Sequence, residues 1–137
     1  MALTHLIDTS VLTRLGNPAV RAVVDPLAHN GVAGRAGITD LEIGYGSRNA
    51  TEWDQDMADL AVFELVETTA DHVGRARQVQ RLLASRSQRG RKVPDLLIAA
   101  AAEKAELILL HYDGDFDLVA KVTGQPCQWV VPAGTVD

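Results

Sequence analysis

Short apolar runs alternate with longer segments of helical character along this chain. The predicted strands are residues 5–7, 35–38, 62–66, 107–110 and 128–131, of which 107–110 is wholly apolar and the others include a polar or charged residue; their length is typical of β-strands. The longer segments are residues 18–29, 39–45, 52–60, 72–89, 94–105 and 115–122, where the spacing of apolar side chains or the flanking residues favour helices. Because helices alternate with strands throughout, the pattern predicts an α/β domain with a mostly parallel central sheet flanked by helices.

Particular residues mark where these elements begin and end. The run 107–110 is wholly apolar, as expected of a central parallel strand that is covered on both faces. Pro94 stands in the first turn of the helix 94–105, where proline is favourable. Gly90 is expected to end the helix 72–89. No repeat or biased linker interrupts the pattern, so we expect a single domain over residues 1–137.

Composition narrows the class of protein. Of the 137 residues, 47% are hydrophobic and 23% are charged, which is the balance of a folded domain rather than of a disordered tail. The longest apolar run, residues 96–102, is far short of the ~20 residues that a membrane helix needs. Cys127 is the only cysteine, so no disulfide can form within the chain. No secretory signal is visible, and we expect a cytoplasmic protein without a membrane partner.

Charge is distributed unevenly along the chain. The formal net charge is −5, which by itself argues against a nucleic-acid partner. Residues 40–71 carry nine acidic side chains against the single basic Arg48. Residues 72–94 carry no Asp or Glu but seven of the 13 Lys and Arg residues: Arg75, Arg77, Arg81, Arg86, Arg89, Arg91 and Lys92. The whole-chain charge hides this basic segment, which is suited to an anionic partner.

Several acidic residues are expected to meet at one edge of the sheet. Asp8 directly follows the strand 5–7, and Asp113 follows the strand 107–110 after two residues, with Asp115 just beyond. Glu42 and Asp95 each fall within the first turn or so of a predicted helix. In open parallel sheets ligands bind outside the carboxyl ends of the strands, and the helices that leave those ends begin there. The separated acids are therefore predicted to converge.

Each acid also has a purely structural interpretation. Asp8 is able to cap the following helix, and Glu42 lies three residues after Thr39, which is the spacing of a capping box. Asp95 suits the positive end of a helix dipole, and Asp113 suits a turn. Taken together, however, four like charges at one edge repel one another unless protons or a cation neutralise them. Oxygen ligands without His or Cys favour Mg²⁺ or Mn²⁺ over zinc.

Four segments of the sequence resemble the acidic motifs of PIN domains. They are Asp8-Thr9-Ser10, Glu42 at the end of Thr39-Asp-Leu-Glu, Pro94-Asp95-Leu-Leu-Ile-Ala-Ala, and His111-Tyr-Asp113-Gly-Asp115-Phe116. Their order and spacing cover almost the whole chain. The likeness extends to the VapC toxins of VapBC toxin–antitoxin modules, which are small one-domain PIN proteins of about this length.

The resemblance implies an endoribonuclease that depends on Mg²⁺ or Mn²⁺, acts as a toxin and is neutralised by a cognate VapB-like antitoxin. It also implies a homodimer and an RNA substrate, which in this family is tRNA, ribosomal RNA or messenger RNA. The residues that match the four catalytic carboxylates are Asp8, Glu42, Asp95 and Asp113. The implied metal ligands are Asp8, Asp95, Asp113 and Asp115, and the supporting hydroxyl residue is Thr9 or Ser10. The number of metal ions, and whether Asp113 or Asp115 is the more direct ligand, stay open.

The carboxylates are chemically suited to this activity, and other classes fit less well. A metal ion held by carboxylates lowers the pKa of a bound water and offsets charge on a phosphodiester during attack. A haloacid-dehalogenase phosphatase or a receiver domain requires further acids or a downstream Lys at a strand end, whereas Asp8 is followed by Thr9 and Ser10. A non-catalytic module that binds RNA or a protein partner is the second alternative.

The basic segment is the predicted contact with the RNA backbone. Residues 85–92 run out of a helix into a Gly-containing loop and lead within three residues to Asp95. We therefore expect phosphate contacts, which position RNA without reading its sequence, from Arg86, Arg89, Arg91 and Lys92. For Arg75, Arg77 and Arg81, RNA binding and a solvated helix face are equally good interpretations.

Overall fold

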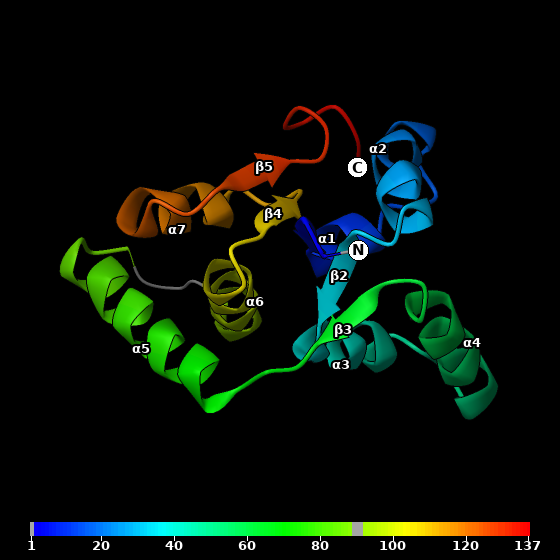
Figure 1. The fold of residues 1–137 in the computed structure, drawn as a ribbon, viewed down its shortest axis with the longest axis horizontal. Helices are drawn as coiled ribbons and strands as arrows, with labels where there is room; N and C mark the ends of the chain where they lie inside the picture. Colours follow the sequence, from blue (N-terminus) through cyan, green and yellow to red (C-terminus); the bar gives the residue numbers. More distant parts are fainter. Residues whose placement is uncertain (1, 89–91) are drawn as a thin grey trace.

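A five-stranded parallel sheet forms the centre of the molecule (Figure 1). The computed structural model describes residues 2–88 and 92–137. The strands lie in the order β3-β2-β1-β4-β5, and every neighbouring pair is parallel. Their bounds are β1 (His5–Ile7), β2 (Ala33–Ala36), β3 (Glu64–Val66), β4 (Ile108–His111) and β5 (Cys127–Trp129). The predicted α/β class and parallel sheet are confirmed.

The order in which strands are added to the sheet switches from one side of β1 to the other, so β1 and β4 lie at a topological switch point. From β1 it moves outward through β2 to β3, and it then returns to pair β4 with the other edge of β1. The connecting helices are α1 (Thr9–Leu12), α2 (Pro18–His29), α3 (Gly37–Tyr45), α4 (Ala50–Leu60), α5 (Ala70–Ser85), α6 (Val93–Lys104) and α7 (Asp115–Thr123). Such a switch point opens a crevice at the carboxyl ends of the two strands.

Alternate residues of the central strands face opposite helical layers. Leu6 and Leu109, which pair in register, belong to a buried cluster with α5, α6 and α7. Ile7 and Leu110, the next pair, belong to a second cluster with α1 and α2. This alternation is what the two-residue period of a strand requires. In Figure 1, α5, α6 and α7 accordingly gather at the left of the sheet and α2 lies at the right.

Local signals account for where the longer helices begin. Asn17 caps α2 by accepting a hydrogen bond from the backbone N–H of Ala19, and Pro18 follows at the first helical position. Thr69 and His72 form a reciprocal capping box at the start of α5. Pro94 lies in the first turn of α6, so its ring fits where no hydrogen-bond donor is needed. The first turn of α6, which begins at Val93, also carries Asp95.

Several predicted boundaries were wrong, among them those of one strand and of the longest helix. The strand predicted at residues 35–38 is β2, two residues earlier, and the small side chains of Ala33 and Gly34 hid it from a hydrophobicity pattern. An added Cβ at Gly34 would lie 2.8 Å from Leu3 Cδ1 and 3.1 Å from the backbone O of Glu64, so neighbouring residues pack closely against this position. The helix predicted at residues 72–89 ends at Ser85, because Ser87 takes a left-handed conformation (φ 57°) that breaks the helix. Gly90, its predicted terminator, lies outside the described residues.

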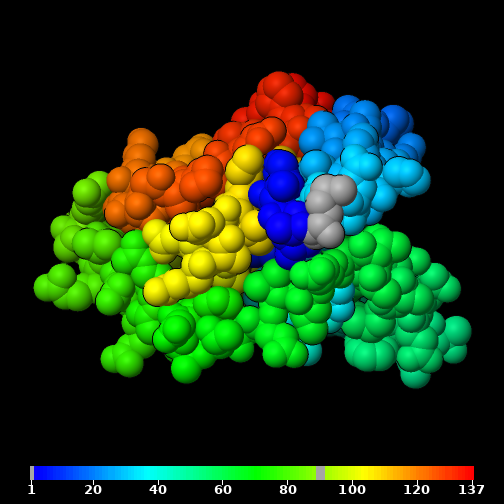
Figure 2. All heavy atoms as spheres, viewed as in Figure 1, coloured from blue at the N-terminus to red at the C-terminus, as the bar shows by residue number. Residues whose placement is uncertain are grey.

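The C-terminal residues return to the N-terminal part of the chain. Figure 2 shows them (red) beside the α2 region (blue), and Val136 packs on the buried cluster that contains Val20 and Val24. The side chain of Tyr112 holds this end, since its hydroxyl donates to Val136 O at 2.8 Å. Within residues 2–88 and 92–137, no helix is both long and apolar enough to span a bilayer.

Candidate metal centre

A pocket of about 460 Å³ opens at the carboxyl ends of β1 and β4, at the switch point of the sheet. It is lined by Asp8, Thr9, Ser10, Thr13, Arg14, Glu42, Lys92, Asp95, Tyr112, Asp113 and Gly114. The four predicted catalytic carboxylates therefore lie in one pocket, although up to 105 residues separate them along the chain. Parallel pairing of β1 with β4 is what brings the first and the last of them together.

Asp8 is fixed by hydrogen bonds at the end of β1. It is the N-cap of α1, and its Oδ2 accepts hydrogen bonds from the backbone N of Ser10 (2.9 Å) and from Ser10 Oγ (2.5 Å). Ser10 Oγ in turn accepts a hydrogen bond from the backbone N of Tyr112 (2.9 Å), just after β4. The backbone N of Asp8 donates to Leu110 O at 2.9 Å. The ends of the two strands are thus joined through Asp8 and its supporting serine.

The second carboxylate oxygen of Asp8 is buried without a partner. Asp8 is only 2% exposed, and its Oδ1 has no hydrogen-bond partner among the described residues. Burial raises the pKa of Asp8 to about 6, against the opposing effect of the Ser10 hydrogen bonds. An unpaired oxygen in a buried carboxylate costs free energy and calls for a proton or a cation.

Asp95 has a similar environment at the start of α6. It is 5% exposed, and its Oδ2 likewise finds no hydrogen-bond partner in the described part of the chain. Burial, and next the negative charge of Asp8, raise the pKa of Asp95 to about 7. Two neighbouring buried carboxylates with raised pKa values are typical of a functional site rather than of a helix cap. Glu42 and Asp113 add further negative charge to both.

Glu42 is held by a threonine of α1 and not by a capping box. Thr9 Oγ1 donates a hydrogen bond to Glu42 Oε1 at 2.7 Å and lies 3.0 Å from Thr39 Oγ1. The cap of α3 is Ala36, and Thr39 is fully buried within the helix. The expectation that a helix begins at Thr39 was therefore wrong by two residues, and the capping-box interpretation of Glu42 fails with it.

Asp113 and Asp115 lie in and after the turn that follows β4. Asp113 Oδ1 accepts a hydrogen bond from the backbone N of Asp115 at 2.9 Å, and the backbone N of Asp113 donates to Nδ1 of the fully buried His111. Burial raises the pKa of Asp113, but hydrogen bonds from Asp115 N and Lys92 outweigh it and leave the pKa below its usual value. Oxygens of Asp95, Asp113 and Asp115 come within 4.8 Å of one another, as a metal site requires.

A lysine contacts these acids. Lys92 Nζ donates a hydrogen bond to Asp113 Oδ2 at 3.1 Å and lies 3.8 Å from Asp95 Oδ2. The sequence placed Lys92 among the RNA-binding residues, and its contact with the acids was not foreseen. Sequence analysis also missed two further residues that line the pocket, Arg14 and Tyr112. The guanidinium carbon of Arg14 lies 4.9 Å from the centroid of the Tyr112 ring. The sequence signal that could have revealed the contact of Lys92 with the acids is its position three residues before Asp95.

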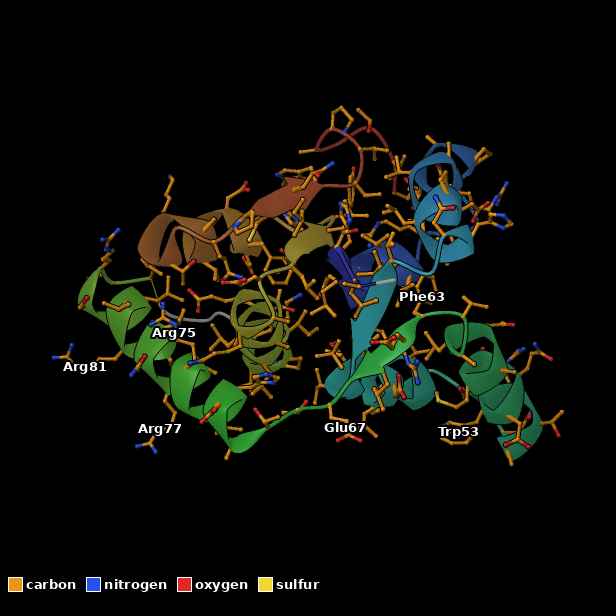
Figure 3. All side chains as sticks on the ribbon, viewed as in Figure 1. Trp53, Phe63, Glu67, Arg75, Arg77 and Arg81 are labelled. Carbon is orange, nitrogen blue, oxygen red and sulfur yellow. The ribbon has the colours of Figure 1, made fainter. Side chains whose placement is uncertain are left out.

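The other basic residues take different positions. Arg86 is exposed at the C-terminal end of α5, while Arg89 and Arg91 lie outside the described residues. Arg75 forms a two-point ion pair with Glu103 of α6 (2.6 and 3.1 Å), so it joins two helices. Figure 3 shows Arg77 and Arg81 pointing away from the body of the molecule. This outward position fits either role given above for Arg77 and Arg81, an RNA contact or a solvated surface.

Comparison with known proteins agrees with the fold and with the arrangement of the acids. Residues 5–122 match the family model described as "PIN domain". The chain belongs to the PIN domain family. It is 64% identical over 137 residues to Ribonuclease VapC51 of Mycobacterium tuberculosis, with all of both chains covered. It is 38% identical to Ribonuclease VapC21 of the same species, over 98% of this chain and 99% of that one.

Solved structures share the fold of this PIN domain. VapBC from Salmonella typhimurium, bound to DNA, superposes with a TM-score of 0.77 at 15% identity, over 94% of this chain and 99% of that one. VapBC2 from Rickettsia felis, bound to a DNA fragment from the promoter, gives a TM-score of 0.76 at 16% identity, covering 93% and 98%. The resemblance read from the acidic motifs is thereby confirmed at the level of family and fold.

The donor set of this PIN domain fits a hard divalent cation. Each acidic group offers oxygen, the ligand that Mg²⁺ and Mn²⁺ prefer, and His111 is turned away into the core between the rings of Phe116 and Trp129. The unpartnered oxygens of Asp8 and Asp95 are buried where a cation would compensate them. These carboxylates therefore form a candidate site for a divalent ion.

Proposed function

We propose that this protein is a divalent-metal-dependent endoribonuclease and the toxin of a type II toxin–antitoxin module. The observation that carries the proposal is the pair of buried carboxylates, Asp8 and Asp95, each with an oxygen that lacks a hydrogen-bond partner among the described residues. The extensive identity to ribonucleases named VapC supports the same activity. Asp8 also caps α1, and Asp95 Oδ2 lies 3.8 Å from Lys92 Nζ, but neither contact gives these two oxygens a hydrogen bond within the described part of the chain.

The residues divide the work of the site among them. Asp8, Asp95, Asp113 and Asp115 hold Mg²⁺ or Mn²⁺, which when bound supplies a water of lowered pKa and offsets charge on the scissile phosphate. Ser10 fixes the orientation of Asp8 through Oδ2 and leaves Oδ1 for the ion. Glu42, oriented by Thr9, is placed in the same pocket to accept a proton from the attacking water.

RNA approaches an acidic pocket only if positive charge offsets the repulsion between its phosphates and the carboxylates. We assign this role to Arg86 at the end of α5, together with Arg89 and Arg91 of the segment that leads to α6. Lys92, the N-cap of α6, lines the pocket itself. Contacts of this kind hold the backbone without reading bases, so they do not choose among tRNA, ribosomal RNA and messenger RNA.

A cognate antitoxin is proposed to cover the pocket and an apolar surface beside it. A second pocket of about 320 Å³ is lined by Leu41, Glu42 and Tyr45 of α3, so Glu42 borders both pockets. Leu41 is 69% and Tyr45 93% exposed, so two large side chains of α3 are left uncovered by this chain. An inhibitory segment that places apolar side chains on α3 and an Arg against the carboxylates would match both surfaces.

Three measurements test this proposal. Purified protein incubated with RNA in Mg²⁺ should cleave it, and excess EDTA should abolish cleavage; binding without cleavage in Mg²⁺ would favour a non-catalytic RNA-binding module instead. Co-expression of the neighbouring gene product should restore growth and yield a stable complex. If it neither binds nor restores growth, the toxin–antitoxin assignment fails even where ribonuclease activity is intact. Sedimentation of the free protein checks the proposed homodimer.

A further inference from the structure

The ammonium group of Lys92 contacts members of the group of acids whose oxygens are arranged to hold a metal ion, namely Asp95, Asp113 and Asp115. Its ammonium nitrogen is 3.1 Å from Asp113 Oδ2 and 3.8 Å from Asp95 Oδ2. Asp95, Asp113 and Asp115 are the three residues whose oxygens gather within 4.8 Å. Two of the three are therefore already in contact with, or next to, a cation that the chain itself supplies. The remaining carboxylate, Asp115, acts on Lys92 through its charge.

The position of Lys92 in the fold makes this contact reversible. As the N-cap of α6, Lys92 has its backbone fixed three residues before Asp95, while 62% of its side chain is exposed. A long side chain with exposed methylenes is able to leave its partners without disturbing the helix. Its hydrogen bond with Asp113 raises the pKa of Lys92, so the ammonium group is charged throughout the physiological range. Ion pairs this exposed are weak, so displacement costs little.

A divalent ion and this ammonium group compete for the same carboxylates. Oxygen ligands surround Mg²⁺ at ~2.1 Å, so an ion held by Asp95, Asp113 and Asp115 would lie close to the ammonium nitrogen that now contacts Asp113. Two cations at such distances also repel each other. Lys92 thus offsets part of the negative charge of Asp113 and Asp95 before metal binds, and the metal offsets that charge afterwards.

We infer that Lys92 is a resident counter-cation of the acidic pocket, and that a divalent ion binds only by displacing its ammonium group from Asp113. The chain thereby holds its acids together when metal is scarce and sets the metal concentration at which the site fills. The inference rests on the proposed function only in requiring that a divalent ion binds here. It concerns binding, so it is testable without RNA cleavage.

Mn²⁺ binding measured by electron paramagnetic resonance tests the competition. Lys92→Met keeps the length of the side chain but removes its charge, and should bind Mn²⁺ about five-fold more tightly, the scale of a partly exposed ion pair. Lys92→Arg keeps the charge and should bind no more tightly than the unmodified protein. Lys121→Met, on the exposed side of α7, is the matched control and should leave the affinity unchanged. Equal affinities in Lys92→Met and the unmodified protein would overturn the inference.

Nuclear magnetic resonance of the lysine ¹⁵Nζ groups separates displacement from simple repulsion. The Lys92 signal, assigned by its loss in Lys92→Arg, should shift and exchange faster with water when Mg²⁺ saturates the site, because its bond to Asp113 is broken. An unchanged Lys92 signal in Mg²⁺-saturated protein would contradict displacement. If neither Mn²⁺ nor Mg²⁺ binds the unmodified protein or Lys92→Met, the metal mechanism itself fails, which is a distinguishable result.

Discussion

The Ser10 hydroxyl donates a 2.5 Å hydrogen bond to Asp8 Oδ2 and so determines which oxygen of that carboxylate is left for a ligand. The same hydroxyl accepts from the backbone N of Tyr112, which ties α1 to the end of β4. Oδ2 of Asp8 is thus engaged by the fold, whereas Oδ1 accepts no hydrogen bond from residues 2–88 or 92–137. Ser10 therefore both joins α1 to the end of β4 and orients the carboxylate of Asp8.

Replacing Ser10 should lower the stability of the fold and weaken metal binding at the site. Ser10→Ala removes the hydroxyl and leaves the backbone N of Tyr112 without its acceptor, which should lower the free energy of unfolding by about 1–3 kcal/mol. Loss of a hydrogen bond to the charged form of Asp8 should also move metal binding to higher pH. Urea unfolding and Mn²⁺ titration at several pH values measure the two effects. Ser10→Thr retains the hydroxyl and serves as control; an Ala variant as stable as the Thr variant would contradict the linkage.

The metal-free protein should lose stability as pH rises. Asp8 and Asp95 have pKa values raised to about 6 and about 7, so the folded state holds their protons more strongly than the unfolded chain does. Their contribution is complete below the unfolded pKa near 4 and disappears as pH rises through 6 and 7, with up to about 3 kcal/mol at stake for Asp8. Thermal unfolding in EDTA between pH 5 and 7.5 measures this.

Two comparisons sharpen that experiment. In Asp8→Asn the amide oxygen still accepts from Ser10 but nothing titrates, so the fall in stability should be smaller. Mg²⁺ should stabilise the unmodified protein more at pH 7.5 than at pH 5.5, since its ligands must lose their protons first. Stability that rises with pH in EDTA would show that the two buried carboxylates are compensated by other groups.

The α3 surface should matter for inhibition and not for cleavage. Leu41→Glu places a charge on the exposed apolar pocket beside Glu42, and should weaken binding of the antitoxin by at least about ten-fold while RNA cleavage persists. Val73→Glu, at a half-exposed apolar position on α5, is the control and should be neutralised normally. Antitoxin titration of the cleavage rate measures both; full inhibition of Leu41→Glu would place the antitoxin elsewhere.

The basic segment should set the salt dependence of RNA binding. Joint replacement of Arg86, Arg89 and Arg91 by Ala should weaken RNA binding for all sequences and flatten its salt dependence by about 0.7 log unit per lost contact. Metal binding should survive. The triple variant of Arg21, Arg48 and Lys121, which carries the same change in net charge, is the matched control. A basic-segment variant with the original affinity and salt slope would mean that these arginines only solvate the surface.

The sequence was sufficient to predict the acids but not how they are held. Asp8 and Asp113 were predictable because each follows a short apolar run, and parallel strands present such residues at one edge. The role of Thr9 was not, because its bond to Glu42 spans 33 positions and depends on how α1 packs on α3. That tertiary contact also explains why the spacing of Thr39 and Glu42 was misleading.

The contact between Lys92 and Asp113 likewise could not be predicted from the sequence. Its position in a basic segment predicted an RNA contact, since a run of like charges is normally solvated or bound to a polyanion. Its bond to Asp113, 21 positions away, depends on α6 beginning beside the end of β4. A sequence pattern records that a charge is present, whereas the fold decides which opposite charge lies within its reach.

RNA cleavage by Asp8→Asn tests the central claim most directly. The variant keeps the shape of the side chain and its bond with Ser10 but removes the charge that the metal requires, whereas Asp54→Asn changes an exposed acid on α4. In Mg²⁺, Asp8→Asn should cleave at least ~10²-fold more slowly than the unmodified protein, and Asp54→Asn should be unaffected. Cleavage by Asp8→Asn at the unmodified rate, with both proteins equally folded, would contradict a metal-dependent mechanism at this pocket.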